Sequence, residues 1–161
     1  MNNNKNAQWT FCILRVVIGF GFMAHGWAKL SRGTAGFEKL LVQTGVPLAH
    51  FMSWLVPFTE LLGGLALLLG LFVTLVTIPL IATMLVAMFT VQIHYGFSAV
   101  KTIGLTPAGP VFGPPGYEIN LVYLAGLLVL MVNGGGAYAL DRRRRRSQDV
   151  KSLTRPTPDH R

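Results

Sequence analysis

Residues 61–100, LLGGLALLLGLFVTLVTIPLIATMLVAMFTVQIHYGFSAV, contain no Asp, Glu, Lys or Arg. A transmembrane helix needs about 20 predominantly apolar residues, so this uncharged stretch of about 40 residues is long enough to cross a bilayer twice. We predict one helix over residues 52–71 and a second over residues 74–95, with Gly70 near the end of the first. Their short connection requires the two helices to run antiparallel. The stretch therefore predicts a helical hairpin inside a membrane.

Two more apolar segments flank this hairpin. Residues 119–140 carry no charge and lie between Glu118 and Asp141, which predicts another helix of span length. Residues 9–29 predict the remaining span, although Arg15 lies inside it and a charge at membrane depth is expensive. A basic N-terminus before an apolar stretch is also the pattern of a signal peptide. A charge within the apolar region is unusual for a signal peptide, so we favour an uncleaved helix.

The composition of the chain agrees with four membrane crossings. Hydrophobic residues make up 52% of the 161 positions and charged residues only 12%, which is outside the range of an ordinary soluble domain. The net charge of +8 is concentrated in the run from Arg142 to Arg146, which indicates a membrane surface rather than a nucleic acid as partner. We predict an all-α integral membrane protein, a four-helix bundle over residues 9–141.

The charges beside the spans predict how the chain is oriented. Four crossings place both termini on one side of the membrane, and the arginine run assigns that side to the cytoplasm. Lys29, Arg32 and Lys39 would then lie in an outer loop and count against this orientation, but the arginine run is denser. We expect a multi-pass protein of the inner (plasma) membrane, with residues 1–8 and a disordered basic tail, residues 142–161, in the cytoplasm.

Two remaining features limit the chemistry of the chain. Residues 102–116 contain four prolines among glycines, so we expect an outer loop there rather than a regular helix or a central strand. Cys12 is the only cysteine, so the chain cannot form an internal disulfide or a multi-thiolate metal site. We expect Cys12 near the cytoplasmic end, as a small apolar core residue.

Ionisable residues inside or at the edge of the predicted spans are the candidates for function, because a charge there commonly has a partner or a task. A helix rises about 1.5 Å per residue, so His25 would lie about 6 Å below the outer end of its helix and Glu60 about 12 Å below that of the next. Their side chains could therefore meet. The candidate cluster consists of Arg15, His25, Lys29, Glu60, His94 and Glu118.

Small residues accompany these charges. Gly19 and Gly26 lie on the face of the first helix that also carries its two basic residues. Glu60 is followed closely by Gly63 and Gly64. Such glycines let another helix approach closely, either within the bundle or across a homodimer.

Several interpretations of the cluster remain open. Glu60 could pair with a basic residue of the first helix and lock the bundle, which is a structural role. Glu60 and His25 could instead relay protons, as the reduction of a quinone at the membrane edge requires. The same groups could line a polar path for a small solute or ion. No local spacing supports a metal site. In the proton-relay interpretation Glu60 and His25 are the candidate catalytic residues, and the candidate cofactor-binding residues are Arg15, Lys29, Glu118 and His94.

Four motifs, taken in order, resemble the DoxX family of four-helix membrane proteins. They are Arg15-x3-Gly19-x5-His25-Gly26-x2-Lys29, Glu60-x2-Gly63-Gly64-x5-Gly70, Gly116-Tyr117-Glu118-x-Asn120, and Gly134-Gly135-Gly136 followed by Leu140-Asp141. The resemblance covers about residues 10–141. The family typically has a serine before the Leu-Asp pair, where this chain has Ala139.

The resemblance implies a role in membrane redox chemistry. The family is named for a subunit of a thiosulfate:quinone oxidoreductase, and similar proteins are associated with membrane complexes that handle thiols and oxidative stress. It implies that this chain, which has no cofactor motif of its own, is a membrane anchor that faces a quinone, while a soluble redox enzyme supplies the sulfur chemistry. A small-solute or ion transporter and a non-catalytic assembly protein are the alternatives.

Overall fold

The structure, a computed structural model, describes residues 3–141. Its helices are α1 (Asn3–Ser31), α2 (Thr34–Gln43), α3 (Ala49–Leu69), α4 (Val73–Thr90), the short 3-10 helix η1 (Gln92–Tyr95) and α5 (Glu118–Asn133). Two strands, β1 (Thr102–Thr106) and β2 (Gly109–Phe112), precede α5. Our predictions for the basic tail, residues 142–161, including the arginine run, lie outside the described residues.

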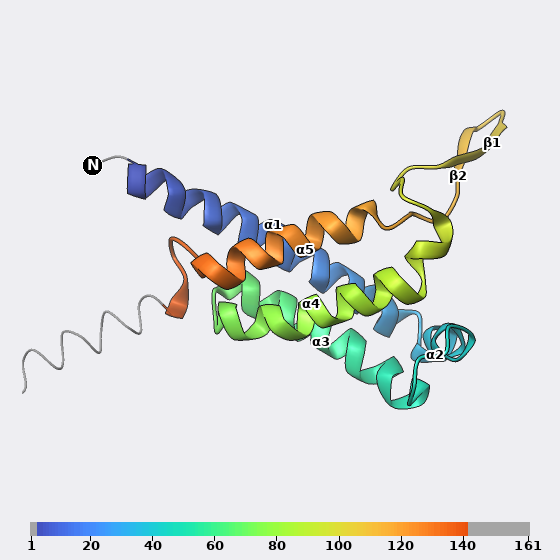
Figure 1. The fold of residues 1–161 in the computed structure, drawn as a ribbon, viewed down its shortest axis with the longest axis horizontal. Coiled ribbons are helices and arrows are strands. Elements are labelled where there is room, and N and C mark those ends of the chain that lie inside the picture. Colours follow the sequence, from blue (N-terminus) through green and yellow to red (C-terminus); the bar gives the residue numbers. More distant parts are fainter. Residues whose placement is uncertain (1–2, 142–161) are drawn as a thin grey trace, which may run out of the picture.

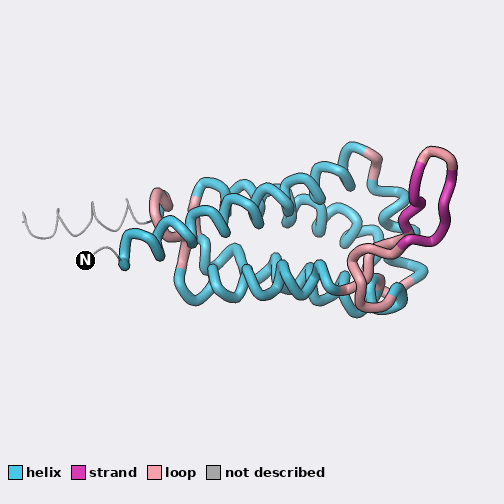
Figure 2. Tube along the Cα trace, turned by 90° about the horizontal axis from the view of Figure 1, so that it is seen from above, coloured by secondary structure: helices cyan, strands magenta, loops and turns pink. Residues whose placement is uncertain are grey.

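Four long helices form the body of the molecule, each antiparallel to the next along the chain (Figure 1). α1 packs against α3 and α5, and α4 packs against the same two helices from the other side. The predicted all-α four-helix bundle is confirmed. Because the helices alternate in direction, α1 begins at the same end of the bundle at which residue 141 lies (Figures 1 and 2).

The two ends of the bundle differ in structure. One end, which we call the hairpin end, comprises the last turn of α1, α2, the first turn of α3 and residues 91–118, including the β-hairpin. The other end, which we call the glycine end, comprises the first turns of α1, the α3–α4 turn at residues 70–72 and residues 134–141. The β-hairpin extends beyond the helices at its end of the bundle (Figure 1).

The turn between α3 and α4 is set by Gly70. This residue adopts a left-handed conformation with φ of 69°, which costs glycine little because it has no Cβ. Its amide donates to the Leu67 carbonyl, and the Leu71 amide donates to the Ala66 carbonyl, a hydrogen-bond pattern that closes a helix C-terminus. The chain therefore reverses within three residues and α4 starts at Val73.

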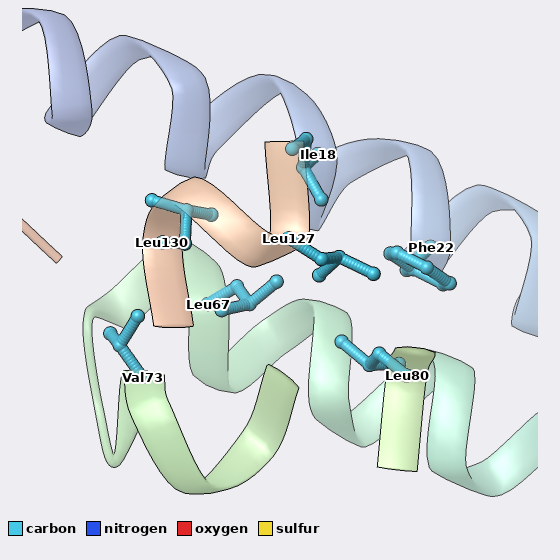
Figure 3. Close-up of a cluster of buried hydrophobic side chains, with 7 residues drawn as sticks. All are labelled: Ile18, Phe22, Leu67, Val73, Leu80, Leu127 and Leu130. Carbon is cyan, nitrogen blue, oxygen red and sulfur yellow. The ribbon is translucent and has the colours of Figure 1, made fainter. Parts of the chain in front are cut away.

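The core is a narrow apolar seam at the centre of the bundle (Figure 3). Its buried members come from all four long helices: Ile18, Phe22, Leu67, Val73, Leu80, Leu127 and Leu130. Many other large apolar side chains are exposed on the outer faces, among them Phe20, Leu75 and Val132. In water such a surface would be unfavourable, whereas in a bilayer it contacts lipid chains.

Three of the described helices are long and apolar enough to cross a membrane: α1, α3 and α4. α5 has 16 residues and spans about 24 Å, somewhat less than a hydrocarbon core of about 30 Å. We predicted this last helix over residues 119–140, but Gly134, with φ of 74°, ends it early. The helix predicted over residues 74–95 likewise stops at Thr90 and continues as η1. α1 and α3 start earlier than the predicted residues 9 and 52.

The segments between the spans contain more regular structure than we expected. α2 lies between α1 and α3 and packs against α3. In the proline-rich segment, β1 and β2 pair as an antiparallel hairpin with an irregularity between Thr102 and Gly104. Pro110 is tolerated in β2 because a two-stranded sheet consists only of edge strands.

Candidate functional site

A buried ion pair joins α1 to α3 near the hairpin end. The Lys29 ammonium nitrogen Nζ lies 2.6 Å from each carboxylate oxygen of Glu60. Glu60 is only 2% exposed, whereas the Lys29 side chain is 28% exposed. The ring of Phe37, on α2, lies 4.9 Å from the same nitrogen, which adds a cation–π contact. Lys29, rather than His25, is therefore the partner of the buried acid.

The ion pair forms because glycines let the two helices come unusually close. A Cβ added to Gly26 would lie 2.6 Å from the Pro57 carbonyl oxygen, and one added to Gly64 would lie 2.5 Å from the Gly19 carbonyl oxygen. Real side chains do not reach such distances without displacing the backbone. These glycines pack against the facing helix of the same chain. They therefore give no support to the homodimer that we considered from the sequence.

His25 occupies a different environment from Glu60. It is exposed on α1, and its ring lies 6.3 Å from the ring of Tyr123 on α5 in an edge-on arrangement. Tyr123 also meets Phe22 edge-on, with 5.2 Å between ring centroids. His25 is one helical turn from Lys29 but faces α5, whereas Lys29 faces α3. In the structure His25 packs against Tyr123, and Glu60 pairs with Lys29. The proton relay between His25 and Glu60 therefore stays a prediction.

The two remaining candidates at the hairpin end lie in connecting structure. His94 belongs to η1 and is exposed. Glu118, the first residue of α5, accepts a hydrogen bond of 2.8 Å from the Ala99 amide. It therefore holds the loop before the β-hairpin instead of joining the pair of Lys29 and Glu60.

Arg15 lies apart from the cluster with which we grouped it. It precedes Lys29 by 14 residues, which is about 21 Å along a helix, and it belongs to the glycine end. It is 2% exposed, and its Nη2 makes two long contacts of 3.5 Å, to the Cys12 sulfur and to the Ala137 carbonyl oxygen. Its Nε and Nη1 have no partner among the described residues. Cys12 lies at this same end and is half-buried, whereas we predicted a core residue; its place near the cytoplasmic end stays a prediction.

We quoted Asn120 and Asp141 only within the family motifs and predicted no role for either. Asn120 is buried, and its Nδ2 donates weakly to the Met84 carbonyl at 3.5 Å. Asp141 accepts a hydrogen bond from the Val73 amide at the start of α4. A polar residue in an uncharged span could have drawn attention to Asn120. The contact of Tyr123 with His25 had no signal in the sequence, because it depends on how α1 and α5 are rotated.

The comparison with known proteins identifies the family. The family model DoxX matches residues 10–93, slightly more than half of the chain. The "Inner membrane protein YqjF" of Escherichia coli is 32% identical over 81% of this chain and 88% of that relative. The chain belongs to the DoxX family. Within the matched region this DoxX protein carries Arg15, His25 and the pair of Lys29 and Glu60.

Two further relatives match this DoxX protein. The "Uncharacterized membrane protein Rv3486" of Mycobacterium tuberculosis is 28% identical over 81% of this chain and 78% of that relative. The "Putative oxidoreductase CatD" of Bacillus subtilis is 30% identical over 58% of this chain and 68% of that relative. No solved structure matches the chain. The membrane-protein relatives and the three candidate spans establish a multi-pass membrane protein.

Proposed function

We propose that this chain is the membrane subunit of a redox complex, which anchors a soluble redox enzyme and presents a quinone-docking surface. The observation that carries the proposal is the exposed His25 ring against Tyr123, on the outer face of the bundle. The name of the Bacillus subtilis relative supports an oxidoreductase context. We further propose that the glycine end faces the cytoplasm, because the arginine run follows residue 141.

The residues between α1 and α5 fit the chemistry of a quinone. Quinones are dissolved in the bilayer, so their docking surface must open sideways toward lipid, as the exposed surface at His25 does. The imidazole of His25 and the phenol of Tyr123 can both donate hydrogen bonds to a carbonyl oxygen. A quinone bound there supplies an acceptor for two electrons and two protons. His25 is the group suited to deliver a proton, since an imidazole can both accept and donate one.

The pair of Lys29 and Glu60 positions this surface. Lys29 lies one turn after His25 on α1, so its bidentate bond to Glu60 fixes the last turns of α1 against α3. Fixing α1 in turn fixes the direction in which His25 projects. In this proposal Glu60 is a positioning residue, and the electrons come from the soluble partner.

The proposal is tested by purifying the tagged full-length protein from its native membrane in mild detergent. Mass spectrometry then identifies the proteins and lipid-soluble molecules that remain bound. A quinone in about equal amount to the protein, together with a redox enzyme, is the expected result. A preparation with only phospholipid would contradict the proposal and would make uptake assays in vesicles, for a transporter, the next experiment.

Replacing His25 with alanine is expected to lower the amount of bound quinone by about fivefold or more, because one hydrogen bond to the carbonyl is lost. Quinone is extracted from the purified variant and quantified per mole of protein. His94→Ala removes another exposed histidine at the same end, away from Tyr123, and should retain the wild-type amount. Equal losses in both variants would mean that His25 has no specific role.

A further inference from the structure

The β-hairpin carries large apolar side chains on a part of the molecule that extends beyond the membrane helices (Figures 1 and 2). Leu105 is 83% exposed and Phe112 is 58% exposed. Val100, just before β1, is exposed as well. Apolar side chains on the outer faces of the helices contact lipid, but those of the hairpin lie past the helix ends. Exposed apolar patches commonly mark a surface that binds a partner.

The most exposed apolar side chains of the two strands share one face of the hairpin. Leu105 lies opposite Pro110 in the register of the two strands, and the side chains of opposite residues project from the same face. Phe112 follows Pro110 by two positions, so it lies on this face too. The other face carries Thr106 and the less exposed Val111. We call the side with Leu105, Pro110 and Phe112 the apolar face of the hairpin.

Hydrogen bonds fix the base of the hairpin to the start of α5. The Glu118 amide donates to the Phe97 carbonyl oxygen at 3.0 Å, and the Glu118 carboxylate accepts from the Ala99 amide at 2.8 Å. The rings of Phe97 and Tyr117 meet edge-on, with 5.4 Å between their centroids. The position of the hairpin relative to the bilayer is therefore set by the position of α5.

Exposed apolar residues connect the lipid-facing surface of α4 with the hairpin. Phe89 at the end of α4, Ile93 in η1 and Phe97 after it are all exposed. The chain is a multi-pass membrane protein, so the outer surface of α4 contacts lipid. Because the apolar residues continue from this lipid contact into the hairpin, the same bilayer is the partner that they favour.

The charge of this segment also suits a membrane surface. Residues 91–117 contain no Asp or Glu, and Lys101 is their only Lys or Arg. Lys101 is exposed and immediately precedes β1. Anionic lipid headgroups attract a lysine near the surface, whereas they would repel an acidic side chain. The segment therefore complements a bilayer that contains anionic lipid.

Backbone hydrogen bonding limits how deep the hairpin can lie. Within residues 3–141 the sheet has only two strands, so the outward backbone groups of each strand have no strand to pair with. The hydrocarbon core does not tolerate such groups, whereas water and headgroups satisfy them at the membrane interface. The hairpin therefore fits the depth of the headgroups, where only its side chains reach the acyl chains.

We propose that the apolar face of the hairpin docks onto the bilayer interface at the hairpin end, as a membrane contact in addition to the spans. Leu105 and Phe112 insert between the outer parts of the acyl chains, and Lys101 lies among the phosphates. Apolar burial and attraction to anionic lipid act together in contacts of this kind. The contact is separate from the proposed quinone surface and does not depend on that function.

The test measures the depth of spin labels on the hairpin in nanodiscs of phosphatidylcholine and phosphatidylglycerol. The full-length protein carries Cys12→Ser, and a nitroxide is attached at Leu105→Cys or at Thr106→Cys. Electron paramagnetic resonance compares two collision rates of the label, with oxygen, which concentrates in the bilayer, and with a nickel chelate, which stays in water. Oxygen collisions should exceed nickel collisions at Leu105→Cys, and the order should be reversed at Thr106→Cys on the other face.

Two neighbouring substitutions in β2 provide a matched pair without a change of charge. Phe112→Gln should lower the ratio of oxygen to nickel collisions at Leu105→Cys by about fivefold or more, because a large apolar side chain no longer inserts. Val111→Gln, on the other face, should leave that ratio unchanged. Equal effects of the two substitutions would overturn the proposal.

The labels also distinguish the lipid surface from other surroundings of the hairpin. Nickel collisions that exceed oxygen collisions at both Leu105→Cys and Thr106→Cys would place the hairpin in water and overturn the proposal. Slow collisions with both reagents at Leu105→Cys would overturn it as well, because they would mean that a second copy of the chain covers the apolar face.

Discussion

Replacing Lys29 with methionine is expected to destabilise the protein by about 3–5 kcal/mol, because it leaves an uncompensated charge in the bundle. Glu60 is 2% exposed, and both its oxygens are bonded to the lysine that is removed. The free energy of unfolding is measured by titrating mixed detergent micelles with a denaturing detergent and following helix content by circular dichroism. Methionine keeps most of the side-chain volume, so the loss reports the charge rather than a cavity.

Glu60→Gln should cost less than Lys29→Met, although both remove the same ion pair. The lysine side chain is 28% exposed, so after loss of the acid its ammonium can extend toward water or headgroups. The double variant Lys29→Met, Glu60→Leu should recover much of the stability, because an apolar pair carries no desolvation cost. Lys39→Met, on the exposed side of α2, should stay within about 0.5 kcal/mol of wild type.

These variants also separate a structural pair from a proton relay. A Glu60→Gln protein that folds but loses its bound quinone or its activity would support the relay predicted from the sequence. A Glu60→Gln protein that is less stable but retains quinone would support the positioning role. If Lys29→Met changed the stability by less than about 1 kcal/mol, neither role would account for the buried geometry.

The four long helices could be predicted because bilayer thickness constrains both the length and the charge of a membrane-spanning segment. An uncharged stretch such as residues 61–100 has few alternatives to a helical hairpin. The ends of the helices were less predictable, since a residue such as Gly134 can end a helix before the apolar stretch ends. α2 and the β-hairpin escaped prediction because neither lies in an apolar stretch, where membrane arguments apply.

The candidate site was predicted only in part. The sequence indicates how far along its helix a residue lies, but not which neighbouring helix its side chain faces. Counting residues along the helices placed His25, Lys29 and Glu60 at similar depth, which is why the ion pair lies where acids and bases were expected. Counting residues could not show which neighbouring helix each side of α1 faces. In the structure Lys29 contacts α3 and His25 contacts α5. For Arg15 the shared helix face was recognised, but 14 residues of helix separate it from Lys29.

Replacing Gly64 with leucine is expected to destabilise the bundle by about 3 kcal/mol or more, because the added atoms meet backbone rather than flexible side chains. The first added carbon would lie 2.5 Å from the Gly19 carbonyl oxygen and 2.7 Å from the Met23 amide nitrogen. Since neither group can rotate away, α1 and α3 must separate. Thermal unfolding in detergent, followed by circular dichroism, measures the loss.

Two other glycines provide a graded control with the same substitution. Gly63→Leu meets only the side chain of Leu80, at 3.0 Å, so we expect an intermediate loss. Gly36→Leu in α2 has nothing within 4 Å of its added Cβ and should stabilise its helix by a few tenths of a kcal/mol, as helix propensity predicts. Losses of equal size at Gly63 and Gly64 would contradict a specific backbone contact between α1 and α3.

The close approach of α1 and α3 and the ion pair should be energetically coupled. If Gly64→Leu separates the two helices, it also draws Lys29 away from Glu60, so part of the ion pair is already lost in that variant. Gly64→Leu combined with Lys29→Met should then cost less than the sum of the single losses, by about 1 kcal/mol or more. If the two losses of stability were strictly additive, the leucine would be accommodated by local rearrangement at Gly64. The glycine contact and the ion pair would then stabilise the position of α1 independently.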